Sequence, residues 1–254
     1  MWTIYDSLID GIDGSATADD IILGANYSYV RSGNGTGISG AMDDTSRGAM
    51  IPRKYIGMPL RELAVCVKSW NFTEASLGLA AINSWYNEKE RLGALGISVS
   101  EKTKTEDRSN DPFIMMQKDI VGKNVTVVGH FPYIDKLFAP VCNLSVIEKF
   151  DPSDGDFPEQ AADYLLPESD YVFISSYTLV EKQFPRFLKL SEKAFVTLIG
   201  PASPITPVLH GLGVDAVAGL AIRDGEFARN AALGLAGNIH GAGQKVNYLK
   251  VRKV

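Results

Sequence analysis

Residues that bind soft metals or cross-link a secreted protein are scarce in this sequence. Its cysteines are Cys66 and Cys142, and its histidines are His130, His210 and His240. Two cysteines argue against the disulfide framework of a small secreted domain. No spacing among the five residues resembles C-x-x-C or H-E-x-x-H. The sequence therefore argues against a zinc site built by the protein alone.

Long apolar runs and an excess of positive charge are also lacking. No apolar run approaches the roughly 20 residues that span a membrane. The N-terminal segment lacks the basic start and the apolar core of a signal peptide. The net charge of −5 provides no basic footprint for nucleic acid. We therefore expect a cytoplasmic protein with no membrane partner and no nucleic-acid partner.

The sequence does have enough apolar residues for a sizeable core. The chain has 254 residues, of which 45% are hydrophobic and 22% are charged, a balance typical of globular proteins. This length suits one large domain or two small ones. The segment Ser98–Asp111 is charged and polar, as linkers and exposed loops are. We place one domain over residues 1–100 and a second over residues 110–254.

The first domain is predicted to be a small α+β unit. Apolar residues at helical spacing predict its helices, and a turn-rich segment between apolar runs predicts a hairpin. Asn71 followed by Glu74 has the spacing of a capping box. The expected elements are a helix over Trp2–Ile12, a strand over Ile21–Val30, its hairpin partner over Ile38–Met42, and helices over Met58–Ser69 and Phe72–Tyr86.

The second domain is predicted to be a Rossmann-like, mostly parallel sheet with helices on both faces. The run Val125–Val128 suits a strand buried on both faces, and Gly129 then allows a tight turn. Apolar runs alternate with helical segments from there onward, which is typical of βαβ winding. One of these helical segments is expected over Leu179–Leu190. Further strands are expected at Leu144–Ile147, Asp170–Ile174, Ala194–Ile199 and Val214–Ala218, with an edge strand in the tail.

Ligands of such sheets bind at the carboxyl ends of the strands, which places His130 at the expected mouth of a site. An unperturbed histidine pKa near 6.5 suits acid/base work or metal ligation. The alternative is a histidine that caps its own helix or bonds a loop carbonyl. Glu148 lies 19 positions after Gly129, where dinucleotide folds place the acid that holds ribose. The second and third glycines of G-x-G-x-x-G are missing, which disfavours NAD and FAD but leaves S-adenosylmethionine open.

Other polar residues near strand ends have both a structural and a ligand-binding interpretation. Asp156 and Glu159 have capping-box spacing, and capping would also place Asp156 beside the ligand edge. Asn83 lies in an otherwise apolar helix, where it either bonds neighbouring backbone or contacts a ligand in a cleft. Ser176 and Ser203 follow strands, but no G-x-S-x-G elbow surrounds them.

Several of these segments recur in order in one known family. The segments are Val127-Val128-Gly129-His130-Phe131-Pro132, Gly155-Asp156-Phe157-Pro158, Tyr177-Thr178-Leu179-Val180, and Gly200-Pro201-Ala202-Ser203-Pro204-Ile205-Thr206-Pro207 with Gly213-Val214-Asp215. Together with the helix around Leu77–Asn83, they resemble the putative heavy-metal chelation family over most of the chain. The resemblance implies an N-terminal domain like that of enolases, a Rossmann-like C-terminal domain, and a ligand cleft between them.

Composition limits what chelation can mean in this chain. A protein that grips heavy metal directly needs soft thiolates or clustered imidazoles, which are scarce here. We therefore expect a protein that binds, modifies or helps to make a small organic metal chelator in the cleft. If it catalyses a reaction, His130 is the predicted acid/base group, oriented by Glu148 or Asp156. The predicted ligand-binding residues are Asn83, Gly129, Glu148, Asp156, Ser176 and Ser203.

Two other functions stay open at this stage. One is a transferase that uses S-adenosylmethionine, suggested by the single-glycine turn and by Glu148. The other is a non-catalytic binding module, which a His130 bonded entirely by main chain would favour. The sequence identifies no cofactor. A homo-oligomer is compatible with it, although no surface stripe argues for one.

Overall fold

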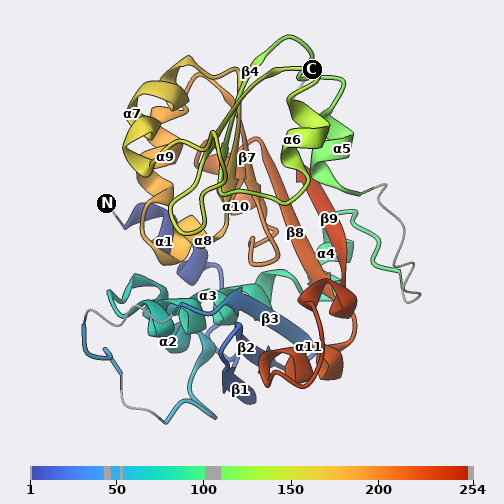
Figure 1. The fold of residues 1–254 in the computed structure, drawn as a ribbon. Coiled ribbons are helices and arrows are strands. Elements are labelled where there is room, and N and C mark those ends of the chain that lie inside the picture. The colour runs from blue at the N-terminus through green and yellow to red at the C-terminus, as the bar shows by residue number, and fades with distance from the viewer. Residues whose placement is uncertain (1, 43–46, 52–53, 101–109, 251–254) are drawn as a thin grey trace.

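The fold is seen in a computed structural model that describes residues 2–42, 47–51, 54–100 and 110–250. It contains a three-stranded sheet in the N-terminal half and a six-stranded sheet in the C-terminal half. In Figure 1 the small sheet lies below, and the large sheet stands above it with helices on both faces. Among the described residues, no helix combines the length and the apolarity needed to cross a membrane.

The small sheet is antiparallel with the order β1-β2-β3. Its strands are Asp20–Leu23, Tyr27–Ser32 and Gly35–Gly40, after a first helix α1 at Thr3–Asp10. The predicted hairpin onto Ile38 is confirmed. The prediction of one continuous strand over Ile21–Val30 is wrong, because the chain turns after β1. Gly24 makes this turn, and a β-carbon there would lie 1.8 Å from the carbonyl oxygen of Ala232.

Further helical segments of the N-terminal half are α2 (Leu60–Val65), η1 (Cys66–Lys68), α3 (Phe72–Tyr86) and α4 (Lys89–Ala94). As predicted, α3 is buried on nearly every side, and it packs across β2 and β3. The side chain of Asn71 accepts the Glu74 N–H at 3.1 Å, which confirms the predicted cap. The reciprocal half of the capping box is wrong. The Glu74 carboxylate instead accepts the N–H groups of Met50 at 2.7 Å and Ile51 at 3.1 Å.

The large sheet has the order β5-β4-β6-β7-β8-β9, in which only β9 is antiparallel to its neighbour. All five predicted parallel strands and the predicted edge strand are present. The strands are β4 (Asn124–Val128), β5 (Asn143–Ile147), β6 (Tyr171–Ser175), β7 (Phe195–Ile199), β8 (Ala216–Ile222) and β9 (Gly243–Leu249). Because β5 and β6 flank β4 on opposite sides, the winding reverses between β4 and β6.

Helices and short 3-10 turns connect these strands. They are α5 (Pro112–Met116), α6 (Ile134–Phe138), η2 (Glu159–Ala161), α7 (Ala162–Leu165), η3 (Leu166–Glu168), α8 (Tyr177–Val180), α9 (Phe184–Leu190), α10 (Pro207–Gly211), α11 (Gly225–Ala232) and η4 (Ile239–Ala242). In Figure 1, α7 and α9 lie on one side of the sheet and α5 and α6 on the other. The helix predicted from Leu179 to Leu190 is broken into α8 and α9 at Lys182, whose φ is 67°.

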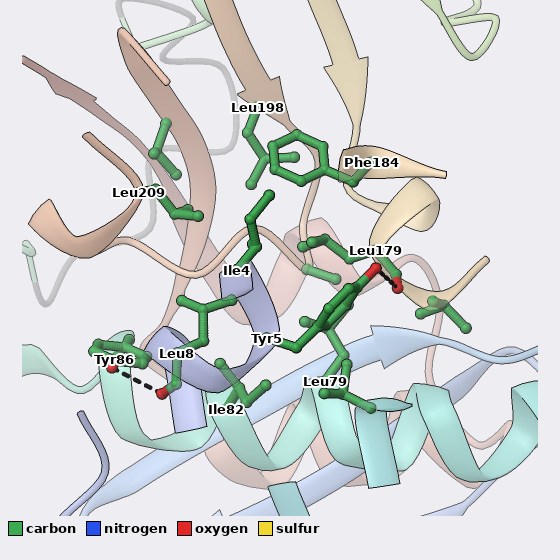
Figure 2. Close-up of a cluster of buried hydrophobic side chains, with 14 of the residues drawn as sticks. Ile4, Tyr5, Leu8, Leu79, Ile82, Tyr86, Leu179, Phe184, Leu198 and Leu209 are labelled. Atoms are coloured by element: carbon green, nitrogen blue, oxygen red, sulfur yellow. Dashed lines mark hydrogen bonds between the residues drawn. The ribbon is translucent and has the colours of Figure 1, made fainter. Parts of the chain in front are cut away.

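The two halves of the chain share one hydrophobic core. Figure 2 shows α1 between α3 and the large sheet, with Ile4, Tyr5 and Leu8 directed into the packed cluster. The Tyr5 hydroxyl donates to the carbonyl oxygen of Leu179 at 3.0 Å, and the Tyr86 hydroxyl donates to that of Leu8 at 2.9 Å. The N-terminal helix therefore ties both sheets together. Most of the predicted linker, residues 101–109, lies outside the described residues.

Candidate functional site

The carboxyl ends of the parallel strands face the small sheet (Figure 1). One sign of this contact is Tyr177, which follows β6 and packs so closely on β3 that a β-carbon on Gly40 would lie 1.9 Å from its hydroxyl. In open α/β sheets, ligands bind outside the carboxyl ends where the winding reverses. That point here lies between β4 and β6. We call the residues around it, Gly129, His130, Asp135, Glu148, Asp156 and Ser175, the switch-point site.

Two glycines allow the strand ends to approach each other at this site. Gly129 after β4 has φ +99°, and a β-carbon there would lie 3.0 Å from the Ser175 β-carbon. Gly200 after β7 has φ +140°, and a β-carbon there would lie 2.3 Å from the Ser176 Oγ. Both backbone conformations disfavour other residues. The end of β6 therefore fits between two turns that only glycine makes without strain.

His130 lies between two carboxylates. Its Nδ1 is 2.9 Å from Oδ2 and 3.1 Å from Oδ1 of Asp156. Its Nε2 is 3.5 Å from Oδ2 of Asp135 at the start of α6. The exposed fraction of the side chain is 14% for His130, 4% for Asp156 and 61% for Asp135. One ring nitrogen thus meets a buried acid, and the other faces an exposed one.

The loop after β5 holds Asp156 in this position. The N–H of Phe157 donates to the carbonyl oxygen of Val146 at 2.7 Å, so the loop returns alongside β5. The Asp156 carboxylate also accepts the Ser153 N–H at 2.7 Å. The capping-box prediction for Asp156 is wrong, because the N-cap position of η2 is Pro158 and no side chain caps it. The Asp156 carboxylate therefore bonds the His130 ring and the backbone of its own loop.

Glu148 organises the backbone of the same two loops. Its Oε2 accepts the His130 N–H, and its Oε1 accepts the N–H groups of Lys149 and Phe150, each at 2.7 Å. Burial of this carboxylate raises its pKa, but the backbone bonds from Phe150, His130 and Lys149 outweigh burial and lower the pKa overall. Both oxygens of Glu148 are therefore engaged by main chain.

The other predicted ligand-binding residues form a second group, buried where the two halves of the chain meet. Asn83, Ser176 and Ser203 are each at most 1% exposed. The Asn83 amide donates to the carbonyl oxygens of Ile38 and Ala202, both at 2.9 Å. Within the described part of the chain, Asn83 Oδ1 and Ser203 Oγ have no hydrogen-bond partner. In this structure the Asn83 amide bonds backbone, which is the first of the two roles considered for it.

The sequence reasoning missed Asn87, which pins the loop after β7. Its amide donates to the Ser203 carbonyl oxygen at 3.1 Å, and its Oδ1 accepts the Ile205 N–H at 2.8 Å. Asn87 lies four positions after Asn83, so both point from the same side of α3. That spacing could have identified the pair. Asp135 was also missed, and nothing in its local sequence distinguishes it from a surface residue.

The protein's own donors are few for a metal ion. Burial raises the pKa of the Cys66 thiol to about 12 and that of the Cys142 thiol to about 11, which keeps both protonated. No three His, Cys, Asp or Glu side chains in the described ranges are grouped so that they could hold a metal. At the switch-point site, His130 Nε2 and the Asp135 carboxylate are the two donors that face each other.

Comparison with known proteins gives two family matches, both described as putative heavy-metal chelation. One model, DUF364, matches residues 111–249, and the other, DUF4213, matches residues 5–86. A Desulfitobacterium hafniense protein of unknown function from the DUF364 family is 42% identical over 98% of this chain and 99% of that chain, with a TM-score of 0.91. A Pyrococcus horikoshii protein of unknown function from that family shares the fold at 19% identity, over 97% of this chain and 98% of that chain, with a TM-score of 0.77. No curated protein matches the chain.

Proposed function

The chain belongs to the putative heavy-metal chelation family, and from this premise we propose that it binds a small organic chelator together with its metal at the switch-point site. The observation that carries the proposal is the pairing of His130 with the buried Asp156 beside the Gly129 turn. In this proposal His130 reaches the metal or its chelator through Nε2. Asp156 acts as the residue that orients the ring.

The hydrogen-bond pattern supports this role for the imidazole. A carboxylate only accepts hydrogen bonds, so the nitrogen that faces Asp156 carries a proton. In the neutral ring Nε2 then presents its lone pair. Metal-binding histidines characteristically donate their other ring N–H to a carboxylate or a carbonyl, which fixes the ring and raises its basicity. The same lone pair can accept a proton from a donor group of the chelator as that group binds metal.

The number of donors favours a chelated metal over a bare ion. Metals held by proteins take four or more ligands. His130 and Asp135 supply two donors that lie 3.5 Å apart, and the raised pKa values of both cysteine thiols keep them protonated. A chelator that fills most coordination positions leaves one or two for the protein. The proposed ligand is therefore a partly saturated metal complex.

The two alternative functions, a transferase that uses S-adenosylmethionine and a non-catalytic binding module, are less well supported. A nucleoside held by Glu148 would need acceptor capacity at its carboxylate, and three backbone N–H groups already use most of that capacity. A non-catalytic binding module was expected if the His130 side chain bonded only to main-chain atoms. The side-chain carboxylates of Asp156 and Asp135 lie against its ring nitrogens instead. The oriented imidazole favours direct contact with the ligand.

Equilibrium dialysis of the full chain tests the proposal with three probes: nickel(II) alone, nitrilotriacetate alone, and their 1:1 complex, which leaves two coordination positions open. We expect the complex to bind more tightly than either component, and His130→Ala to abolish this preference. His240→Ala removes an exposed imidazole elsewhere and should leave binding unchanged. Binding of bare nickel as tight as that of the complex, or full binding by His130→Ala, would overturn the proposal.

A further inference from the structure

The turn between α8 and α9 contains an unusual backbone conformation. Lys182 has φ 67° and is the one non-glycine residue with a positive φ among those described. An L-residue in this region crowds its β-carbon against the backbone, so glycine or asparagine normally stands there. Such outliers persist where the surrounding structure enforces them, and they concentrate at functional sites. The choice of lysine at this position therefore calls for a role for its side chain.

The amine of Lys182 is held against aromatic rings from the other half of the chain. Its Nζ lies 5.3 Å from the centroid of Phe72, the first residue of α3, and 5.9 Å from that of Trp70, two positions before α3. It donates a hydrogen bond to the carbonyl oxygen of Val180 at 2.5 Å. Trp70 is 49% exposed, so solvent reaches the outer side of this cluster. The amine thus lies in a largely apolar, partly open setting.

Charges near Lys182 do little to stabilise its ammonium form. The neighbouring acid, Glu181, forms an ion pair with Lys149 at 3.0 Å, and its own side chain is 6% exposed. In the described ranges, no carboxylate forms an ion pair with Lys182. Burial lowers the pKa of Lys182 to about 7, and the Glu181 charge opposes this only in part. An ordinary lysine, with a pKa near 10.4, stays almost fully charged at neutral pH.

We propose that the Lys182 Nζ is a nucleophilic site that condenses with the carbonyl carbon of a small aromatic aldehyde. The nitrogen lone pair adds to the carbonyl carbon, and the two amine protons leave with the carbonyl oxygen as water, so the product is a neutral imine. The rings of Trp70 and Phe72 are placed to stack on a flat aromatic group. The site does not involve His130, so its failure would leave the proposed function intact.

Reductive labelling of the full chain tests this inference. The protein is incubated at pH 7 with benzaldehyde and sodium cyanoborohydride, which delivers hydride to the imine carbon and leaves a stable benzylamine. Peptide mass spectrometry then gives the rate at each lysine. We expect Lys182 to be labelled at least about tenfold faster than Lys189, an exposed lysine on α9, because far more of Lys182 is neutral.

Two variants separate reactivity from a structural role. Lys182→Asn tolerates the same backbone conformation and lacks the amine, so it should fold and lose the fast labelling. Trp70→Ala should reduce the preference for benzaldehyde over propanal at Lys182. Equal labelling rates for Lys182 and Lys189, or a total fast-phase incorporation that is the same in the wild type and in Lys182→Asn, would overturn the proposal.

Discussion

The imidazole Nδ1 of His130 lies 2.9 Å from Oδ2 of Asp156, although the two residues are 26 positions apart and follow different strands. Glu148 adds a second link between these loops through the His130 N–H. Asp156 and Glu148, both in the loop after β5, thus hold His130 in the loop after β4. Asp156 bonds the imidazole ring, and Glu148 accepts the backbone N–H. The site is a product of the sheet order, which makes β4 and β5 neighbours.

Removal of the Asp156 carboxylate should destabilise the fold as well as the site. Asp156→Ala leaves His130 Nδ1 and the Ser153 N–H without their acceptor. We expect the free energy of unfolding to fall by about 1–3 kcal/mol, as for other buried groups that lose a partner. Asp135→Ala, at a 61% exposed side chain, should change it by less than about 0.5 kcal/mol. Urea denaturation measures both, and equal losses would contradict the account.

Glu148 should make stability depend on pH in a predictable direction. Its pKa is lowered in the folded protein, so its contribution is complete above the unfolded pKa near 4.3 and is lost as pH falls through the lower, folded pKa. Glu148→Gln should therefore be less stable than the wild type at pH 7. The difference in unfolding free energy should shrink as the pH is lowered below about 4.

Denaturation curves across this pH range provide the test for Glu148. Glu192→Gln, at an exposed glutamate after α9, is the matched control and should follow the wild type at every pH. If the difference in unfolding free energy between the wild type and Glu148→Gln stays constant from pH 7 to pH 3, the negative charge of Glu148 does not stabilise the loop.

The contact between Gly200 and Ser176 can be tested by a double-mutant cycle. Gly200→Ala adds a β-carbon 2.3 Å from the Ser176 Oγ at a φ of +140°, and should cost about 1–3 kcal/mol. Ser176→Ala removes the Oγ that would clash with the new β-carbon. The double variant should therefore be more stable than the sum of the two single effects predicts. Urea unfolding gives the coupling energy. If the two unfolding free-energy changes simply add, the strain in Gly200→Ala does not come from contact with the Ser176 hydroxyl.

Asn87 should matter more to stability than Asn83, the residue that sequence reasoning selected. Asn87→Ala deprives the Ile205 N–H and the Ser203 carbonyl of partners, at a cost of about 1–3 kcal/mol. Asn83→Ala also breaks two hydrogen bonds, but it removes a buried oxygen that has no partner among the described residues. We expect a smaller loss for Asn83→Ala in the same denaturation experiment. The reverse order would contradict this description of the junction.

Most of the fold could be predicted because the strands of the large sheet are unbroken apolar runs between clear turn residues. The break after β1 was missed because Gly24 lies within an apolar run, and the need for glycine there comes from the close approach of the Ala232 and Tyr27 backbone. The break between α8 and α9 was missed because Lys182 is a good helix former. Its positive φ is not visible in composition.

The site was only partly predictable for a related reason. His130 was placed at the sheet edge because it follows a predicted strand. Asp156 was placed there by a capping role that it does not have, and its pairing with His130 depends on the path of an irregular loop. The role of Glu148 could not be seen because its partners are backbone N–H groups, which every residue has. Asn83 and Ser203 were expected to line a cleft. In the structure, packing between the two halves buries both side chains.

Native mass spectrometry of protein purified without added metal would show whether a metal chelate occupies the switch-point site. We expect the wild type to carry an adduct whose mass and isotope pattern correspond to one metal ion plus an organic molecule. His130→Ala should lose this adduct, and His240→Ala should retain it. A bare metal ion as the only adduct, or an unchanged adduct on His130→Ala, would contradict the account.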